Sequence, residues 1–297
     1  MNLHNELLDG PITLDPAQLD ELRQFACFLA TTAAAHVRRR RVELGLDLDS
    51  QMETKSSDVD PVTVVDKESE ELIRHLVATQ RPDDAVLGEE QGGGEEVRPG
   101  TVRWLVDPID GTVNFLYGVP AYAVSVGCEV DGRLVAGAVA DIPHNRVYHA
   151  AAAQGAAVTE ADGRSRPIEC SRPAGLDVSL LATGFSYDAQ RRRKQGLLVT
   201  ELLGHVRDIR RMGSAALDLC MLADGQLDCY LEHGLNLWDY AAGAVIAIEA
   251  GAVVTLPAPG SSTADGRAVV ATAHSVAGEF NEILGAMGAL EPIDDHE

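Results

Sequence analysis

The spacing of hydrophobic positions predicts several helices, the first of them near the start of the chain. Asp15 and Pro16 are typical of an N-cap and a first helical residue. Apolar residues then recur on one helical face at Leu19, Leu22, Ala26 and Leu29. After the polar, turn-like stretch that begins at Lys55, a second helix is expected to open at Asp66.

The second half of the chain has a pattern of helices alternating with short apolar strands. The strands are expected at residues 180–185, 227–232, 253–255 and 268–271. The helices are expected around residues 188–204, from the N-cap Ser214 onward, from Asn236 to Ala250 with Gly251 at the end, and from near Ser275. This alternation indicates an α/β half that starts at about residue 171.

Between the first two helices and this region, apolar and polar residues alternate as in β-strands. Short strands are expected at residues 85–90 and 102–106, followed by runs within 121–170. The turn signals Asp131-Gly132 and Asp162-Gly163 separate these later runs. The sequence therefore predicts an antiparallel meander in the first half.

The chemistry concentrates in the stretch from Trp104 to Phe115. A buried strand, expected to end before Pro108, leads into two carboxylates three positions apart, Asp107 and Asp110. The N–H groups of Gly111 and Thr112 come directly afterwards. Carboxylates suit a hard cation and free N–H groups suit an anion, so this turn indicates a metal-assisted phosphate site.

Length and composition fit a folded intracellular protein. The chain has 297 residues, of which 45% are hydrophobic, and its five cysteines are scattered without CxxC spacing, which suggests reduced thiols in the cytoplasm. We find neither a secretory signal nor a membrane-spanning run, and expect no membrane partner. The expected organisation is a flexible tail at 1–14, one catalytic domain at 15–290 with a metal-binding half (15–170) and a substrate half (171–290), and a tail at 291–297.

A formal net charge of −22 disfavours binding to nucleic acid or to an anionic membrane. It also conflicts with an anionic phosphate substrate, unless bound divalent cations invert the local field. Two basic runs, at 38–41 and 191–194, carry positive charge in this acidic chain. We interpret them as solvated helix ends, with a partner or substrate contact as the alternative.

Taken one at a time, the candidate residues have ordinary explanations. Asp66 and Asp239 could be helix caps, and Glu89 with Glu90 could be solvated surface. His144 and His149 lack zinc-type spacing and are interpreted as structural. Only the combination of motifs can therefore distinguish a functional site from these ordinary structural roles.

That combination resembles the inositol monophosphatase family of magnesium-dependent, lithium-sensitive phosphatases. The resemblance covers roughly residues 15–290. Two departures are Ser214, where the family often has Thr, and Ala252, where it often has a second Gly. The matching blocks are Lys55 with Asp60-Pro61-Val62-Thr63 to Asp66, Gly88-Glu89-Glu90, Trp104 to Phe115, Trp238 to Gly243 through Glu249-Ala250-Gly251, and more weakly Gly213 to Ala216 with Glu232.

The resemblance implies a layered αβαβα sandwich, a homodimer, and hydrolysis of myo-inositol 1-phosphate to inositol and phosphate. We expect two to three Mg²⁺ ions per subunit. Glu89, Asp107 and the carbonyl of Ile109 would hold one ion. Asp107, Asp110 and Asp239 would hold a second, and the family has a third, weaker ion near Glu89.

The remaining roles are also implied by the resemblance. Thr112, oriented by Asp66, would help to deprotonate the attacking water near Glu89, with Glu90 and Lys55 supporting the ligands from behind. The phosphate would accept hydrogen bonds from the N–H groups of Gly111 and Thr112. The substrate contacts would come from Glu89, Asp110, Gly111, Thr112, Gly213, Ser214, Ala215, Glu232 and Asp239.

Two alternatives stay open. A related phosphatase could act on fructose 1,6-bisphosphate, histidinol phosphate or a 3′-phosphoadenosine nucleotide. The aromatic content of 4% argues against stacking an adenine. A non-catalytic binding or regulatory protein on the same fold is the more remote alternative, because it would not need the complete set of carboxylates.

Overall fold

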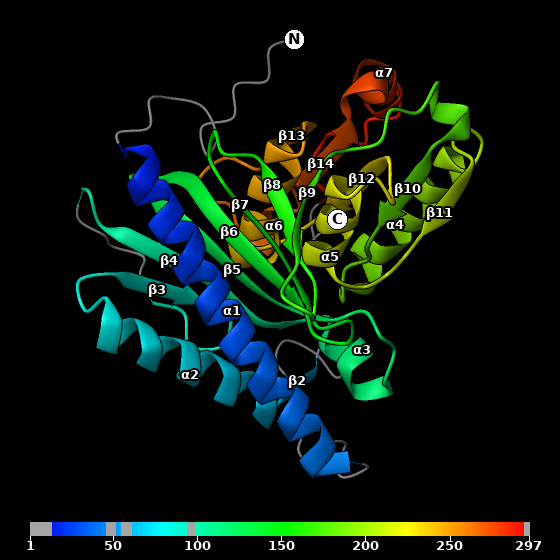
Figure 1. Cartoon of the computed structure of the whole chain (residues 1–297). Helices are drawn as coiled ribbons and strands as arrows, with labels where there is room; N and C mark the ends of the chain where they lie inside the picture. Colours follow the sequence, from blue (N-terminus) through cyan, green and yellow to red (C-terminus); the bar gives the residue numbers. More distant parts are fainter. Residues whose placement is uncertain (1–13, 46–51, 55–60, 94–98, 294–297) are drawn as a thin grey trace.

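The structure is a computed structural model that describes residues 14–45, 52–54, 61–93 and 99–293. Two β-sheets are stacked with helices outside them and between them (Figure 1). The order of layers is α1 and α2, a seven-stranded sheet, α5 and α6, a five-stranded sheet, and α4 with α7. The predicted αβαβα sandwich is confirmed.

The seven-stranded sheet forms most of the first half. Its strand order is β3-β4-β5-β6-β7-β8-β9, and every pair is antiparallel except β3 with β4. This confirms the antiparallel meander. The strands are β3 (Ala85–Gly88), β4 (Val102–Asp110), β5 (Ala123–Val130), β6 (Arg133–Asp141), β7 (Arg146–Ala151), β8 (Ala156–Thr159) and β9 (Ser165–Ile168).

Helices α1 (Pro16–Leu44) and α2 (Val64–Gln80) cover the outer face of this sheet. The prediction for α1 is confirmed: Asp15 caps it by accepting from the N–H groups of Ala17 and Gln18. The predicted cap of α2 is wrong by one turn. Thr63 is the N-cap, and Asp66 is the third helical residue of a capping box.

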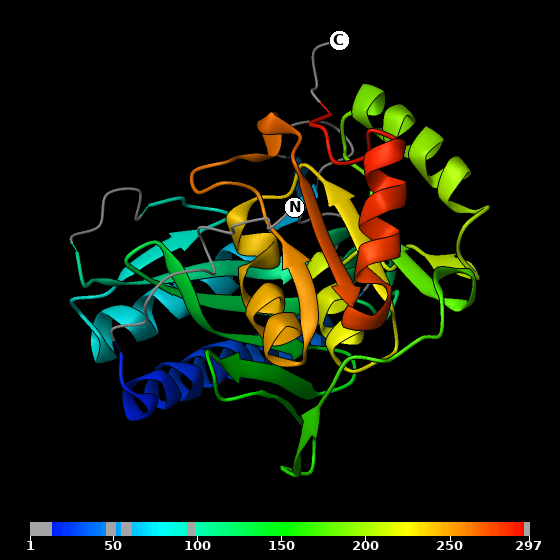
Figure 2. The same ribbon diagram turned by 90° about the horizontal axis from the view of Figure 1, so that it is seen from above.

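Helices α5 (Ala215–Ala223) and α6 (Leu237–Glu249) lie between the two sheets, as Figure 2 shows from above. Two glycines that pair across β5 and β6, Gly127 and Gly137, let α6 approach closely. A Cβ on Gly137 would lie 2.7 Å from the Cα of Ala242, so even alanine would push the helix away. This close contact brings the start of α6 to the end of β4.

The five-stranded sheet belongs to the second half and has the order β11-β10-β12-β14-β13. Strands β11 and β12 run parallel to β10, while β14 is antiparallel to β12 and β13. Helices α4 (Ala189–Leu202) and α7 (Ala277–Ala286) cover its outer face. The strands are β10 (Leu180–Thr183), β11 (Asp208–Arg210), β12 (Cys229–His233), β13 (Ala252–Thr255) and β14 (Ala268–Ala273).

Several short elements were not predicted from the sequence. Strands β1 (Met52–Thr54) and β2 (Pro61–Thr63) form an antiparallel pair, and the turn-like stretch expected from Lys55 lies outside the described residues. The helix α3 (Thr112–Tyr117) begins within the Trp104–Phe115 motif, directly after Gly111. The 3₁₀ helices are η2 (Leu176–Val178), η3 (Thr263–Asp265) and η4 (His274–Val276).

Three expectations about individual segments need correction. Strand β4 continues past Pro108 to Asp110, because the pairing with β5 is interrupted between Asp107 and Asp110 and the proline needs no N–H there. Arg191 is not a solvated helix end: it is 1% exposed in the first turn of α4. Its Nε donates to the carbonyl of Ile293 at 2.8 Å, so Ile293, in the stretch for which the sequence suggested a tail, packs against the second half.

The basic run at the end of α1 also makes specific contacts. Arg40 pairs with Glu68, and Arg41 donates to the carbonyl of Phe115 while stacking over its ring.

All five cysteines are free thiols. Among the described residues, every helix is too short or too polar to cross a lipid bilayer.

Candidate active site

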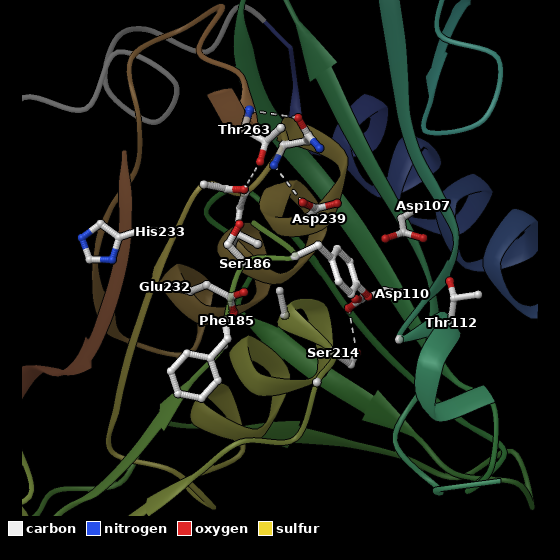
Figure 3. A pocket seen from close by; sticks show the side chains of 18 of the residues that line it. Asp107, Asp110, Thr112, Phe185, Ser186, Ser214, Glu232, His233, Asp239 and Thr263 are labelled. Carbon is white, nitrogen blue, oxygen red and sulfur yellow. Dashed lines mark hydrogen bonds between the residues drawn. The ribbon is translucent and has the colours of Figure 1, made fainter. Parts of the chain in front are cut away.

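A cavity of about 320 Å³ lies between the two halves of the chain, and its lining is mostly polar. Figure 3 shows Asp107 and Thr112 on one side and Glu232, Ser214 and Asp239 on the other. We call the two sides the first wall and the second wall. The first wall consists of Glu89, Asp107, Ile109, Asp110, Gly111 and Thr112, and the second wall includes Gly213, Ser214, Ala215, Glu232 and Asp239.

Asp107 is held at the point where β4 loses its regular pairing. Its side chain is 3% exposed, and its Oδ1 accepts from the N–H of Ile109 at 3.1 Å. The carbonyl of Pro108 accepts from the Ser69 hydroxyl on α2 at 3.2 Å. The interrupted strand is therefore anchored from both sides, and the backbone of Ile109 lines the cavity.

Thr112 and Asp66 form a buried pair behind the first wall. The Thr112 hydroxyl lies 3.1 Å from Asp66 Oδ1 and 3.0 Å from the carbonyl of Ile109. The other oxygen of Asp66 accepts from the N–H and hydroxyl of Thr63. The capping box of α2 thus orients the carboxylate that meets Thr112, so one residue serves both helix and site.

Gly111 turns the chain from β4 into α3 in a conformation that favours glycine, with φ of 94°. A Cβ there would lie 2.8 Å from the carbonyl of Ala121 and 3.1 Å from that of Gly213. The side chain of Asn114 bridges the same two segments, donating to the carbonyls of Ala121 and Met212, each at 2.7 Å. The turn therefore sits against the second half.

Asp110 joins the two walls. Its Oδ2 accepts from the hydroxyl of Ser214 and from the N–H of Ala216, both at 2.7 Å, at the start of α5. Burial raises the pKa of Asp110 to about 6, partly offset by these donors, and the negative charge of Glu89 raises it further. A carboxyl group from the first half therefore helps to cap a helix of the second half.

Asp239 is the third residue of α6 and accepts from the N–H of Asn236 at 2.7 Å. Burial raises the pKa of Asp239 well above its ordinary value, with further contributions from Glu89 and Asp110. Three carboxyl groups from different parts of the chain thus repel one another across the cavity. A bound cation would relieve this repulsion.

Glu232 is placed by two neighbours. The hydroxyl of Tyr230 donates to its Oε2 at 2.8 Å, and the missing side chain of Gly184 leaves room for its carboxylate. A Cβ on Gly184 would lie 2.0 Å from Glu232 Oε2. Burial raises the pKa of Glu232 to about 7, against the lowering effects of Tyr230 and Arg211.

Glu89 follows β3 and lines the cavity, and its N–H donates to the carbonyl of Val106 at 3.1 Å. Glu90 is partly buried but is not among the residues that line the cavity. Lys55 and Asp60, which the family motif includes, lie outside the described residues.

The donor set of the cavity fits magnesium. Six acidic side chains line the cavity, and four of them, Glu89, Asp107, Asp110 and Asp239, together with the backbone of Ile109 offer oxygen donors. In the described part of the chain, no three Asp, Glu, His or Cys side chains are already arranged as a cage for one ion. Magnesium does not require such a cage, because it keeps several waters and binds through one or two carboxylates.

The sequence alone missed several residues of the site. Asn114 lies inside the Trp104–Phe115 motif, but its hydrogen bond to the carbonyl of Met212 in the second half depends on the tertiary structure. Arg191 was assigned to a solvated run, yet it lines the cavity and donates to the carbonyl of Ala264 at 3.2 Å. Glu70 could have been found from its spacing, because it lies one helical turn after Asp66. Asn114 and Glu70 lie behind the lining, and the other missed residues that line the cavity with Arg191 are Gly184, Phe185, Ser186, Tyr187, Asp188, Arg211, His233, Gly234, Leu235, Asn236 and Thr263.

Two stacked sheets with an acidic cavity between them, lined also by the Gly111-Thr112 turn, define a protein suited to holding a hard cation against an anionic group. Comparison with known proteins identifies the family. The model of the inositol monophosphatase family matches residues 18–286, and the chain belongs to this family.

Individual relatives match along almost the whole chain. The inositol-1-monophosphatase SuhB of Mycobacterium tuberculosis is 50% identical over 289 residues, which cover 95% of this chain and 98% of that protein. The inositol-1-monophosphatase of Mycobacterium leprae is 49% identical, covering 93% and 97%. The solved structure of Mycobacterium tuberculosis SuhB superposes with a TM-score of 0.78, at 45% identity, covering 92% of this chain and 98% of that one.

Proposed function

We propose that this protein is a magnesium-dependent phosphomonoesterase that hydrolyses myo-inositol 1-phosphate to inositol and phosphate. The observation that carries the proposal is the cavity itself. Carboxylates from both halves, Asp107 and Asp239 among them, line one space with the Gly111-Thr112 turn. The identity of 50% to an inositol-1-monophosphatase supports the choice of substrate.

Glu89, Asp107, Asp110, Asp239 and the carbonyl of Ile109 would hold two to three magnesium ions. Bound there, the ions would activate a water for attack and stabilise charge on the leaving oxygen. The chain's own contribution is a set of anchored oxygen donors, since Asp107 and Asp110 are both fixed by hydrogen bonds to backbone N–H groups. This anchoring means that little reorganisation is needed when the ions bind.

Thr112 and Asp66 would accept the proton that the attacking water loses. With its own hydrogen directed to Asp66 Oδ1 at 3.1 Å, the Thr112 oxygen presents lone pairs toward the cavity. It can accept the proton of the water as its own proton moves to Asp66. The N–H groups of Gly111 and Thr112 would donate to the phosphate oxygens, where negative charge accumulates.

The second wall would bind the polyol. Glu232, together with the segment from Gly213 to Ala215, would meet the hydroxyl groups of the ring. Carboxylates accept hydrogen bonds from hydroxyls and repel additional phosphate groups, so this wall favours a monophosphate over a bisphosphate.

We extend the proposal to a homodimer that works in the cytoplasm and is inhibited by lithium. The five free cysteines agree with a reducing compartment. Light scattering of the purified protein tests the dimer, and a lithium titration at saturating Mg²⁺ tests the inhibition. Absence of inhibition at millimolar lithium would contradict that part of the proposal.

The deciding experiment is a substrate panel on the purified protein, with and without Mg²⁺. The panel contains myo-inositol 1-phosphate, fructose 1,6-bisphosphate, histidinol phosphate and a 3′-phosphoadenosine nucleotide. We expect the highest kcat/KM for myo-inositol 1-phosphate and no turnover after chelation of Mg²⁺. A higher value for any other substrate would replace the assignment, and no turnover of any would favour a binding protein on the same fold.

A further inference from the structure

Glu70 is a fully buried acid that is outside the family motif blocks and does not line the cavity. It lies on α2, 0% exposed, beneath the turn that follows β3. This turn is tight: Gly88 and Gly92 exchange hydrogen bonds between their N–H and carbonyl groups at 3.2 and 3.0 Å. Glu89, on the first wall, is carried by this turn.

The carboxylate of Glu70 occupies the inside of the turn. Its Oε2 accepts from the N–H of Glu90 at 2.7 Å, and its Oε1 accepts from the N–H of Gln91 at 3.1 Å. The fit leaves no room for a side chain at Gly88, where a Cβ would lie 2.4 Å from the Cδ of Glu70. Glu70 thus holds the backbone on one side of Glu89, while the carbonyl of Val106 holds the N–H of Glu89 itself.

Arg74 completes the clamp from one helical turn further along α2. Its Nε donates to Glu70 Oε1 at 2.8 Å, which orients the carboxylate. Its two other nitrogens donate to the carbonyls of Val86, at 3.2 Å, and of Gly92. The pair therefore binds both ends of the segment that carries Glu89.

The same face of α2 also supports the rest of the first wall. Asp66, four positions before Glu70, meets Thr112, and Ser69, three positions after Asp66, meets the carbonyl of Pro108, so the three residues share one stripe of the helix. One rigid helix thus sets the spacing between the three segments of the first wall. Without Glu70, the segment carrying Glu89 would be attached to this helix only through the bonds from Arg74 to the carbonyls of Val86 and Gly92.

We propose that Glu70, held by Arg74, is a positioning residue that presets Glu89 for metal binding. The inference rests on the proposed role of Glu89 as a metal ligand. It assigns to Glu70 no contact with substrate or with the metal. Its predicted effect is on the affinity for the divalent ion before substrate binds.

The test compares Glu70→Gln with Glu71→Gln, which makes the same chemical change on the exposed neighbour. In Glu70→Gln an amide NH₂ must face at least one of the N–H donors, so the turn loses a strong acceptor while side-chain volume is retained. The readout is Mn²⁺ binding to the substrate-free protein, measured by the electron paramagnetic resonance signal of free Mn²⁺. Mg²⁺ activation curves and thermal melting accompany it.

We expect the Mn²⁺ dissociation constant of Glu70→Gln to rise about 10- to 100-fold, as is typical for groups that orient metal ligands. The Mg²⁺ concentration for half-maximal activity should rise in parallel, while KM for the phosphate at saturating Mg²⁺ changes little. Glu71→Gln should stay within about twofold of the parent. A lower melting temperature with an unchanged Mn²⁺ dissociation constant would overturn the proposal.

Arg74→Lys provides a second variant in case Glu70→Gln does not fold. Lysine keeps the positive charge but cannot bond to Glu70, Val86 and Gly92 together. We expect a rise in the Mn²⁺ dissociation constant of about two- to tenfold, the effect of one or two lost hydrogen bonds. An unchanged constant would argue against the clamp.

Glu89→Gln distinguishes a failure of the proposed role of Glu70 from a failure of the proposed metal site. If it weakens Mn²⁺ binding and Glu70→Gln does not, the role of Glu70 fails while the proposed function stands. If Glu89→Gln leaves both Mn²⁺ binding and turnover unchanged, Glu89 is not a ligand, and the proposed metal site fails with it.

Discussion

The two walls of the cavity are built in different ways. On the first wall, Asp107 and Thr112 are 3% and 8% exposed, and both are hydrogen-bonded to the backbone or to a buried carboxylate. On the second wall, Glu232 and Asp239 are partly exposed and are held by neighbours on their own element, Tyr230 and Asn236. The first wall is supported from behind by a separate helix, whereas the second wall consists of helix starts and a strand end.

This difference suggests that the first wall carries the reacting groups and that Glu232 on the second wall binds the polyol. Reacting groups must be held to within fractions of an ångström, which requires support from outside their own strand. Groups that accept hydrogen bonds from a polyol can tolerate more movement. Substitutions on the first wall should therefore reduce kcat, and substitutions of the polyol-binding residue Glu232 on the second wall should affect substrate choice. The following predictions test that contrast in order of expected effect.

Replacing Asp107 by Asn should reduce kcat by about 10³-fold or more, because metal charge stabilisation is worth several kcal/mol and each 1.36 kcal/mol is a factor of ten. The fold should persist, since the amide oxygen can still accept from the N–H of Ile109. Steady-state kinetics with a circular dichroism melt measure both effects. Asp83→Asn, on an exposed position, is the control. Retained turnover would refute the metal role of Asp107.

Thr112→Val should lower kcat by about 10²- to 10³-fold, the usual contribution of a proton-transfer group. Valine keeps the shape of threonine but removes the hydroxyl that meets Asp66. KM should change little, and Thr112→Ser should restore most of the rate. If the valine variant raised KM alone, Thr112 would bind substrate without taking part in proton transfer.

Glu232→Gln should lower kcat/KM for myo-inositol 1-phosphate about 10- to 150-fold, since a hydrogen bond to a charged group is worth about 1.5–3 kcal/mol. The same variant should hydrolyse p-nitrophenyl phosphate almost normally, because this substrate offers no ring hydroxyls. The ratio of the two kcat/KM values is the measurement. An equal loss on both substrates would place Glu232 in the chemistry and not in polyol binding.

The smallest effect should come from His149, a buried residue of the first half away from both walls. Its Nδ1 faces Arg23 at 2.9 Å and its Nε2 faces Thr159 at 3.0 Å. Burial, with a further contribution from Arg23, lowers the pKa of His149 from 6.5 to about 4. The unfolded chain therefore binds a proton more readily, so stability is complete above about pH 6.5 and decreases as the pH falls toward 4.

Between pH 7 and pH 5 this single residue should cost about 2 kcal/mol of unfolding free energy. Urea unfolding at the two pH values measures the loss, and His149→Gln should reduce it by that amount. His144→Gln is the matched control, because His144 is more exposed and pairs with Asp141. An equal pH dependence in parent and His149→Gln would show that His149 is not the cause.

Local sequence signals predicted most elements of the fold but not their exact ends. The caps Asp15 and Ser214 were recognised because they act within three residues. The extension of β4 to Asp110 was missed because a proline is tolerated there only where pairing with β5 lapses. Arg191 was misread because a run of basic residues does not reveal which one the C-terminal segment will cover.

The sequence by itself determined the residue types of the site, their order and the family to which they point. Periodicity and capping act over a few positions, so they can be read without knowing the rest of the chain. Only the tertiary structure decided that Asp110 would cap α5, that Asn114 would bridge to Met212 and that Glu70 would lie beneath the turn of Glu89. These contacts join residues up to about a hundred positions apart, and they depend on close packing, such as that of α6 on Gly127 and Gly137.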